Sequence, residues 1–539
     1  MNSGSSASTE LKEASFINNA EDCEMAAIKA DRDQFSPLEL RRIRSGAIDM
    51  SPDEQEEEVE KGMSRAQSLN PDIVAWDGPD DPENPFNWKN SKKWFITMVA
   101  ALVTFCVALA SSIFTAGITE IAADFNVSRT VITLGLTFYV MGFATGPLVF
   151  APMSEVYGRN LVYRSSWIFF MLFQIGCALA PNAATLLVCR LISGIAGSSP
   201  ISNAGGTLSD MWRPAERGTA MSFFIGAPFA GPVLGPIIGG FLVEYVSWRW
   251  TFWLILIISG VQFIVLLFLM PETYGRTLLE RKAARLRKET GNMNLHAAHE
   301  TTKISHFSHL RVSIVRPVYM LFTEPIVLCI AVYCALIYAI LYMNFIAYPV
   351  VFQDERGWGA GTGGLPFLGL GFGIMCGICT APAQTRLYVR LTKERGDGMI
   401  YPEGRLPYSI AGAIILPIGI LWFGWGSLLH VHWIVSTIGG AVFGFGLILV
   451  FLSMFSYLVD AYLIYAASAL AGNSLLRSIL GATFPLFADQ MFTKLTPKWA
   501  CTLLACLAFI LAPIPYFFYK FGPRIRALSK MKLTAPSPV

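Results

Sequence analysis

Residues 326–351 read IVLCIAVYCALIYAILYMNFIAYPVV, a run of 26 residues that contains no charged side chain. A helix needs about 20 predominantly apolar residues to cross the hydrocarbon core of a bilayer, which is about 30 Å thick. Inside that core the backbone must satisfy its own hydrogen bonds, and a helix does so within one segment. This stretch therefore predicts a membrane-spanning helix.

Similar apolar runs recur along the whole chain. The other eleven cover residues 94–118, 131–151, 163–179, 184–206, 218–243, 250–270, 363–383, 406–425, 433–458, 461–487 and 499–521. Only 15% of the 539 residues are charged, 53% are hydrophobic and the mean hydropathy is +0.49, whereas soluble domains carry about 25% charged residues. The sequence predicts an all-α membrane protein with twelve transmembrane helices.

The polar segments divide the chain. Residues 1–90 include the acidic run DEQEEEVE at 53–60, lack the pattern of a signal peptide and are predicted to be a disordered cytoplasmic tail. Two six-helix bundles, 91–270 and 321–522, then flank a central cytoplasmic loop at 271–320, and 523–539 form a second tail. Gly142-x3-Gly146 in the second run and Gly373-x3-Gly377 in the eighth form a weak internal repeat, as in transporters built from two related halves.

The distribution of basic residues indicates the orientation of the chain in the membrane. With both termini in the cytoplasm, about 26 Lys and Arg near the spans face inward and about five face outward, which is the asymmetry of the positive-inside rule. The outward residues are Arg129, Arg249, Arg356, Lys494 and Lys498. The sequence thus predicts a multi-pass protein with both termini in the cytoplasm.

Two arginines lie deep within apolar runs, Arg190 in the fourth and Arg477 in the eleventh. An arginine at the centre of a span costs about 2.5–3.5 kcal/mol on insertion scales, so such a residue is expected to face a cavity rather than lipid. Arg190 could instead extend toward the outer edge of its span, and buried amides could simply join helices. The candidate residues of a substrate or coupling cavity are Arg190, Arg477, Asn203, Asn344, Asn473, Gln174 and Gln262.

The loop after the second run reads GPLVFAPMSEVYGR at 146–159 and carries Gly146, Glu155, Gly158 and Arg159. Glu155 and Arg159 stand on a tight glycine turn, where they can pair with charges at neighbouring inner helix ends such as Asp210 or Arg217. The alternative is an ordinary charged inner loop. The pattern resembles the loop motif between spans two and three of the major facilitator superfamily, in the form shown by fungal drug exporters, although that motif normally carries Asp where Glu155 stands.

The fifth run contains GPVLGPIIGG at 231–240. Glycines allow helices to approach closely and prolines bend them, so this string predicts a smooth, kinked face. Its residues are Gly231, Pro232, Gly235, Pro236, Gly239 and Gly240. The string resembles the antiporter motif of exporters in this superfamily. Together with Asp210 and Asp460, which end the fourth and tenth runs, these residues and the loop motif are the candidate gating residues.

The resemblance, closest to the fungal drug:proton antiporters, implies a fold and an activity. It implies two six-helix bundles related by pseudo-twofold symmetry, and a monomeric plasma-membrane exporter of a drug, secondary metabolite or organic acid, driven by proton antiport. A polyamine exporter, an importer of the same fold and a non-transporting membrane sensor are the alternatives. Since the deep charges are both cationic, neutral or anionic cargo is favoured, and Glu120, Asp210 or Asp460 would have to carry the proton.

Other signals are discounted. The sequence predicts no enzyme, cofactor or nucleic-acid partner, because no His-box, clustered carboxylates or basic run with aromatics is present. Cys376-x2-Cys379 lies in an apolar run and is read as packing. The histidines at 296, 299, 306 and 309 lack further ligands, so no metal site is predicted. Asn126-Val-Ser128 is a candidate glycosylation site in the first outer loop.

Overall fold

The computed structural model describes residues 72–78, 80–297, 300, 306–395, 401–462, 465–527 and 529. Most of both predicted tails, as well as His299, lie outside these residues. The chain divides into two compact units. The smaller unit contains the described residues up to Asn87, Arg213–Ala215 and the described part of Gly275–Val312, and the larger unit contains the rest.

The smaller unit joins the start of the described chain to the central loop. Strand β1 (Ile73–Val74) pairs in parallel with β2 (His296–Ala297), beside η1 (Pro85–Asn87) and α11 (Gly275–Thr290). The Lys282 Nζ atom of α11 lies 2.8 Å from Asp77 Oδ1 and 3.0 Å from Asp81 Oδ2. The last part of the predicted tail is therefore structured, and a buried lysine ties it to the loop helix.

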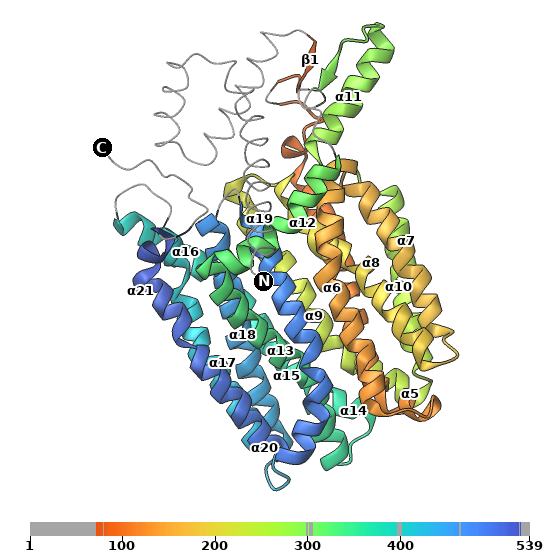
Figure 1. The fold of residues 1–539 in the computed structure, drawn as a ribbon, viewed down its shortest axis with the longest axis vertical. Helices are drawn as coiled ribbons and strands as arrows, with labels where there is room; N and C mark the ends of the chain where they lie inside the picture. The colour runs from red at the N-terminus through yellow and green to blue at the C-terminus, as the bar shows by residue number, and fades with distance from the viewer. Residues whose placement is uncertain are drawn as a thin grey trace, which may run out of the picture. The chain divides into compact units, whose positions relative to one another are not determined.

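The larger unit is a bundle of long helices (Figure 1). Among the described residues, eleven helices are long and apolar enough to cross a membrane. In the first half the helices are α4 (Asn90–Ile113), η2 (Phe114–Gly117), α5 (Ile118–Asp124), α6 (Arg129–Tyr157), α7 (Arg159–Ala178), α8 (Ala183–Ser209), α9 (Pro214–Tyr245) and α10 (Arg249–Phe268). In the second half they are α12 (His306–Thr323), which belongs to this unit from Ser313 onward, α13 (Pro325–Pro349), η3 (Val350–Glu355), α14 (Ala360–Gly364), α15 (Phe367–Cys379), α16 (Ala381–Arg395), η4 (Pro402–Arg405), α17 (Pro407–Gly426), α18 (Trp433–Tyr462), α19 (Ala466–Thr483), α20 (Pro485–Leu511) and α21 (Pro513–Ala527).

The eleventh predicted run corresponds to α19 and the start of α20. Helix α19 has 18 residues and is not among the eleven apolar helices, since it carries Asn473 and Arg477. Helix α20 is broken at Thr496, where φ is 63° and ψ is 155°. Figure 1 shows two legs meeting near the α20 label. Counting α19 with the first leg, and the second leg with α21, gives the twelve predicted passes and an all-α fold.

The internal glycine repeat marks two equivalent helix crossings. In the first half, a Cβ atom at Gly142 would collide with the backbone of Gly194, where α6 crosses α8. In the second half, a Cβ atom at Gly373 would collide with the backbone of Ala441, where α15 crosses α18. In each half the second helix therefore packs closely on the fourth.

The glycine–proline string gives α9 two different faces. Cβ atoms at Gly231, Gly235 or Gly239, which are spaced by four residues, would collide with α4 between Ala108 and Ile113. A Cβ atom at Gly240 would instead meet the carbonyl of Ala360 in α14, which belongs to the other half. One face of α9 packs within its own half and the other contacts the partner half.

Candidate functional site

Arg190 is enclosed by protein within the first half. Its side chain is 0% exposed and donates to three backbone carbonyls: Ala110 at 2.8 Å, Gly135 at 3.2 Å and Ser111 at 3.3 Å. The rings of Tyr139, Phe114 and Phe252 lie 4.3, 4.5 and 6.0 Å from its guanidinium carbon. In this structure Arg190 therefore joins α4, α6 and α8, and its donors already have partners.

Arg477 lies in different surroundings in the second half. Its side chain is partly exposed, and its guanidinium carbon lies 4.7 Å from the ring centre of Tyr338 and 5.6 Å from that of Phe455. One nitrogen donates to Ser474 Oγ at 3.3 Å, while Nε has no hydrogen-bond partner among the described residues. One helical turn earlier, Asn473 is 1% exposed, and neither polar atom of its amide has such a partner.

Of the other predicted cavity residues, three make hydrogen bonds within the first half and one lines a cavity. Gln174 donates to Ser193 at 2.8 Å, Gln262 to the Leu102 carbonyl at 2.9 Å and Asn203 to Ser199 at 3.1 Å. These three bonds lie within the first half and join or brace its helices. Asn344 instead lines a very small cavity, of about 10 Å³, within the second half, together with Tyr348, Ile420, Phe423, Gly440 and Phe443.

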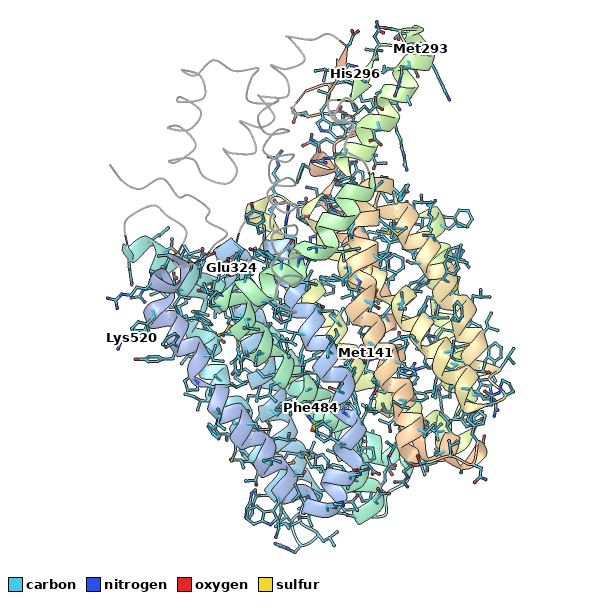
Figure 2. The ribbon with its side chains drawn as sticks, viewed as in Figure 1. Met141, Met293, His296, Glu324, Phe484 and Lys520 are labelled. Carbon is cyan, nitrogen blue, oxygen red and sulfur yellow. The ribbon has the colours of Figure 1, made fainter. Side chains whose placement is uncertain are left out.

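The two halves meet at mid-depth. The hydroxyl groups of Ser111 and Tyr342 are 3.3 Å apart, and those of Tyr342 and Tyr338 are also 3.3 Å apart. Thr137 of α6 donates to the Ala482 carbonyl of α19 at 2.7 Å. Helices α6 and α19 are neighbours, and Figure 2 labels Met141 on α6 and Phe484 directly after the end of α19. The Tyr338–Tyr342 pair thus places the surroundings of Arg477 beside the first half.

At the predicted inner end of the first half, Arg159 organises a charged cluster. Its Nε atom lies 3.1 Å from Asp210 Oδ2, and its Nη1 atom donates to Ser154 Oγ at 2.6 Å. Glu272 accepts from the backbone N–H groups of Arg159 at 2.9 Å and Asn160 at 3.2 Å. The cluster connects the ends of α6, α7, α8 and α10. The preceding Gly158 has a φ of 89°, which favours glycine.

Asp210 has an unusual proton affinity. Burial raises the pKa of Asp210 to about 6, although the Arg159 guanidinium opposes this rise, and Glu272 and Glu155 act in the same direction as burial. Glu155, the other acid of the loop motif, is exposed. The sequence offered Asp210 as a partner for this loop, and the structure places it against Arg159.

The second half has a related cluster at the same end. Arg405 Nε lies 2.9 Å from Asp460 Oδ2, matching the Arg159–Asp210 pair in position at the start of the third helix and the end of the fourth helix of its half. Glu403 is fully buried and accepts from Arg526 of α21 at 2.9 and 3.0 Å. Glu324, labelled in Figure 2, accepts from Tyr462 at 3.1 Å and Ser529 at 2.6 Å.

Direct contacts join the halves at the predicted outer end. Glu244, at the end of α9, accepts a hydrogen bond from the backbone N–H of Gly361 in α14 at 2.7 Å. Arg129 and Asp354 form an ion pair at 3.6 Å between α6 and η3. Asn126, the predicted glycosylation site, is exposed in the loop before α6 with a φ of 51°.

Sequence reasoning missed several of these residues. Ser154, Glu272, Glu324, Glu403 and Arg526 were not among the candidate site residues. A signal for Glu272 existed, because an acid that ends one span can accept from the free N–H groups at the start of another. The partner of Glu403 lies 123 residues away in sequence, and no local pattern reveals such a pairing.

Two related helical halves, charged clusters at one end and polar contacts across mid-depth define the class of a multi-pass membrane transporter. The family described as Major Facilitator Superfamily matches residues 100–485. The chain belongs to this superfamily.

Named relatives come from fungi. The chain is 47% identical over 461 residues to the "MFS-type efflux pump MFS2" of Trichophyton rubrum, covering 85% of this chain and 77% of that protein. It is 42% identical over 460 residues to the "Citrinin biosynthesis cluster MFS transporter mrr1" of Monascus ruber, covering 85% and 92%. The solved inward open structure of the xylose transporter XylE from E. coli is similar in fold, with a TM-score of 0.57 at 14% identity over 79% of this chain and 96% of that one.

Proposed function

We propose that this protein is a secondary-active exporter of small organic molecules that works by alternating access. The contacts between its halves carry the proposal. At the predicted inner end, the Arg159–Asp210 and Arg405–Asp460 pairs each lie within one half. The bonds between halves lie at mid-depth and at the predicted outer end, where Glu244 binds Gly361. This is the arrangement expected of two stiff halves closed toward the outside.

The direction of transport is proposed to be outward. The relatives named above include an efflux pump and a transporter of a biosynthesis cluster. The glycine–proline string of α9 contacts α4 on one face and α14 of the other half on its second face. Such a helix can keep its packing within one half while its contact with the other half changes, and this supports exchange across the membrane.

The coupling ion is proposed to be the proton, and Asp210 the carboxylate that exchanges it. Its pKa of about 6 lies close enough to neutral pH for the proton to be gained and lost. Protonation would remove its charge and weaken its attraction to Arg159. Glu120 and Asp460 remain the other candidates. We further propose that both termini lie in the cytoplasm, because the basic residues near the spans cluster on that side. The resemblance to the fungal exporters supports the proposal of a monomer in the plasma membrane.

Uptake into inside-out vesicles tests this proposal. Vesicles with an acidic interior are supplied with anionic, neutral and cationic compounds, and accumulation is compared with and without a protonophore. We expect at least one compound to accumulate only while the pH gradient is present, and Asp210→Asn to abolish that dependence. Accumulation only when the vesicle exterior is acidic would indicate an importer. If no compound moves in vesicles that contain folded protein, the transporter proposal is wrong.

A further inference from the structure

The guanidinium of Arg477 is a positive charge at mid-membrane depth without an acidic partner. Among the residues that the structure describes, no carboxylate lies within ion-pair distance of it. Arg477 stands 11 residues into α19, and at 1.5 Å per residue this places it about 17 Å from the start of the helix. A charge at this depth is costly unless a counter-charge, water or ligand reaches it.

Arg190 does not share this property. Its donors are taken by three backbone carbonyls, and its side chain is fully buried. Of the two deep arginines, Arg477 is therefore the one whose charge is available to a ligand, and it is also the one that is partly exposed. The site offers a single positive charge rather than two.

Aromatic rings surround this charge. Tyr338 and Phe455 lie against the guanidinium and are themselves partly exposed. Phe451 lies 6.3 Å from Tyr338 between ring centres and 5.6 Å from Phe229 of the first half. A flat ring placed beside Tyr338 could stack on aromatic surface while its polar edge reached Arg477. Phe451 and Phe229 are themselves buried, so the aromatic packing beside Arg477 extends to the interface between the two halves.

The amide of Asn473 supplies the second polar group. It lies four residues before Arg477, so both side chains project from the same face of α19. The Cys334 thiol interacts with it, but a thiol is a weak hydrogen-bonding group, and neither amide atom has a partner at hydrogen-bond distance among the described residues. A buried amide without partners is costly unless a ligand or water satisfies it. Arg477 and Asn473 together offer donors for the two oxygens of one carboxylate.

We propose that Arg477 and Asn473 bind the charged group of a planar aromatic monoanion whose ring stacks on Tyr338 and Phe455. This inference rests on the proposed function, because it names the class of molecule exported. A carboxylate or phenolate suits the single guanidinium, whereas a polyamine would meet an uncompensated positive charge.

Equilibrium binding tests the proposal independently of transport. The full-length protein in phosphatidylcholine nanodiscs is titrated at pH 7.5 with 2-naphthoate, with neutral 2-naphthamide and with cationic 2-naphthylmethylammonium. We expect naphthoate to bind at least about tenfold more tightly than the amide, because a hydrogen bond to a charged group is stronger than a neutral one. Equal affinity for naphthoate and the amide would overturn the proposal.

Variants identify the residues. Arg477→Gln should abolish the preference for naphthoate and leave naphthamide affinity within about threefold, while Arg477→Lys should restore part of it, since lysine keeps the charge but not the planar fork. Tyr338→Leu should weaken all three ring compounds, and Tyr338→Phe should weaken none. Lys494→Gln removes an exposed positive charge from the next helix, α20, and should leave the affinities for all three compounds unchanged. A naphthoate preference that survives in Arg477→Gln would contradict the site.

Two further comparisons distinguish a substrate site from a lipid site, and the ligand class from the exporter function. Adding anionic lipid to the nanodiscs should not displace naphthoate; displacement would show that the site holds a lipid headgroup and would overturn the proposal. If vesicles transport neutral compounds but naphthoate has no binding preference, the ligand class is wrong and the exporter function stands. If naphthoate binds as expected but nothing is transported, the site stands and the exporter function fails.

Discussion

At the scale of single residues, two arginines with the same cost of insertion have different structural roles. Arg190 is surrounded by carbonyls and rings of its own half, whereas Arg477 keeps an unpaired nitrogen and partial exposure. The sequence alone could place both arginines within spans, because each lies inside a long apolar run. It could not distinguish them, since the carbonyls that receive Arg190 belong to helices about 55 to 80 residues away in sequence.

Matched substitutions should separate the two roles. Arg190→Gln leaves buried carbonyls without their charged donor and should lower stability by about 3 kcal/mol, seen as a lower Tm in detergent and poor recovery of protein. Arg477→Gln, in contrast, should keep a Tm close to that of the wild type while abolishing transport. Thermal unfolding and vesicle uptake of the two variants check this. Normal uptake by Arg477→Gln would remove that residue from the site.

Asp210 should give stability a dependence on pH. Because its folded-state pKa of about 6 lies above the ordinary 3.8, the native protein holds a proton between these values that the unfolded chain has lost. Its stabilising contribution is fully present below about pH 4 and is lost as pH rises through about 6, amounting to at most about 3 kcal/mol. Acidification from pH 7.5 to 5 should therefore raise the Tm of the wild type relative to Asp210→Asn.

The control for this pH experiment is Asp80→Asn, which changes an exposed carboxylate of the smaller unit. It should keep the wild-type dependence of Tm on pH. An unchanged dependence in Asp210→Asn would show that another group takes up the proton.

At the scale of helices, α9 and α19 show what pattern can and cannot predict. The glycine–proline string predicted a smooth face on α9, and the structure gives this face two partners, α4 and α14. For α19 the apolar run 461–487 predicted the span, although Asn473 and Arg477 keep α19 itself from counting among the apolar helices, and the span continues into α20. The break at Thr496 falls in the predicted loop between the runs 461–487 and 499–521, and the following Pro497 marks it in the sequence, because the residue before a proline is disfavoured in the helical region.

Because α9 packs closely on α4, replacing Gly235 by a larger residue should slow transport. A methyl group at Gly235 would overlap Ser112 and the backbone of Ile113, and overpacking of this kind costs about 1–3 kcal/mol. Gly235→Ala should lower the transport rate about tenfold or more, measured as initial uptake into vesicles. Gly260→Ala is the matched control, because nothing lies within 4 Å of its added methyl group, and it should transport normally. Equal rates for the two variants would contradict the packing argument.

At the scale of the whole molecule, the twelve apolar runs were sufficient to predict the fold, since lipid admits few architectures. The paired charges were only partly predictable. Asp210 and Asp460 were recognised as helix-end acids, but the pairing of Asp460 with Arg405, and of Glu403 with Arg526, depends on which helix ends come together. The smaller unit was not predicted either, because Lys282 pairs with Asp77 and Asp81, which lie about 200 residues earlier in the sequence.

The central claim is that two stiff halves move against each other, and distances between paired spin labels test it most directly. Labels at Tyr245 and Leu429 report the predicted outer end, and labels at Tyr157 and Arg390 report the inner end. Tyr157 with Leu269, both in the first half, serves as the reference; all five side chains are exposed. With substrate and low external pH, the outer distance should lengthen, the inner distance should shorten and the reference should stay constant. A reference distance that changes with them, or inter-half distances that never change in a protein that transports, would contradict the account.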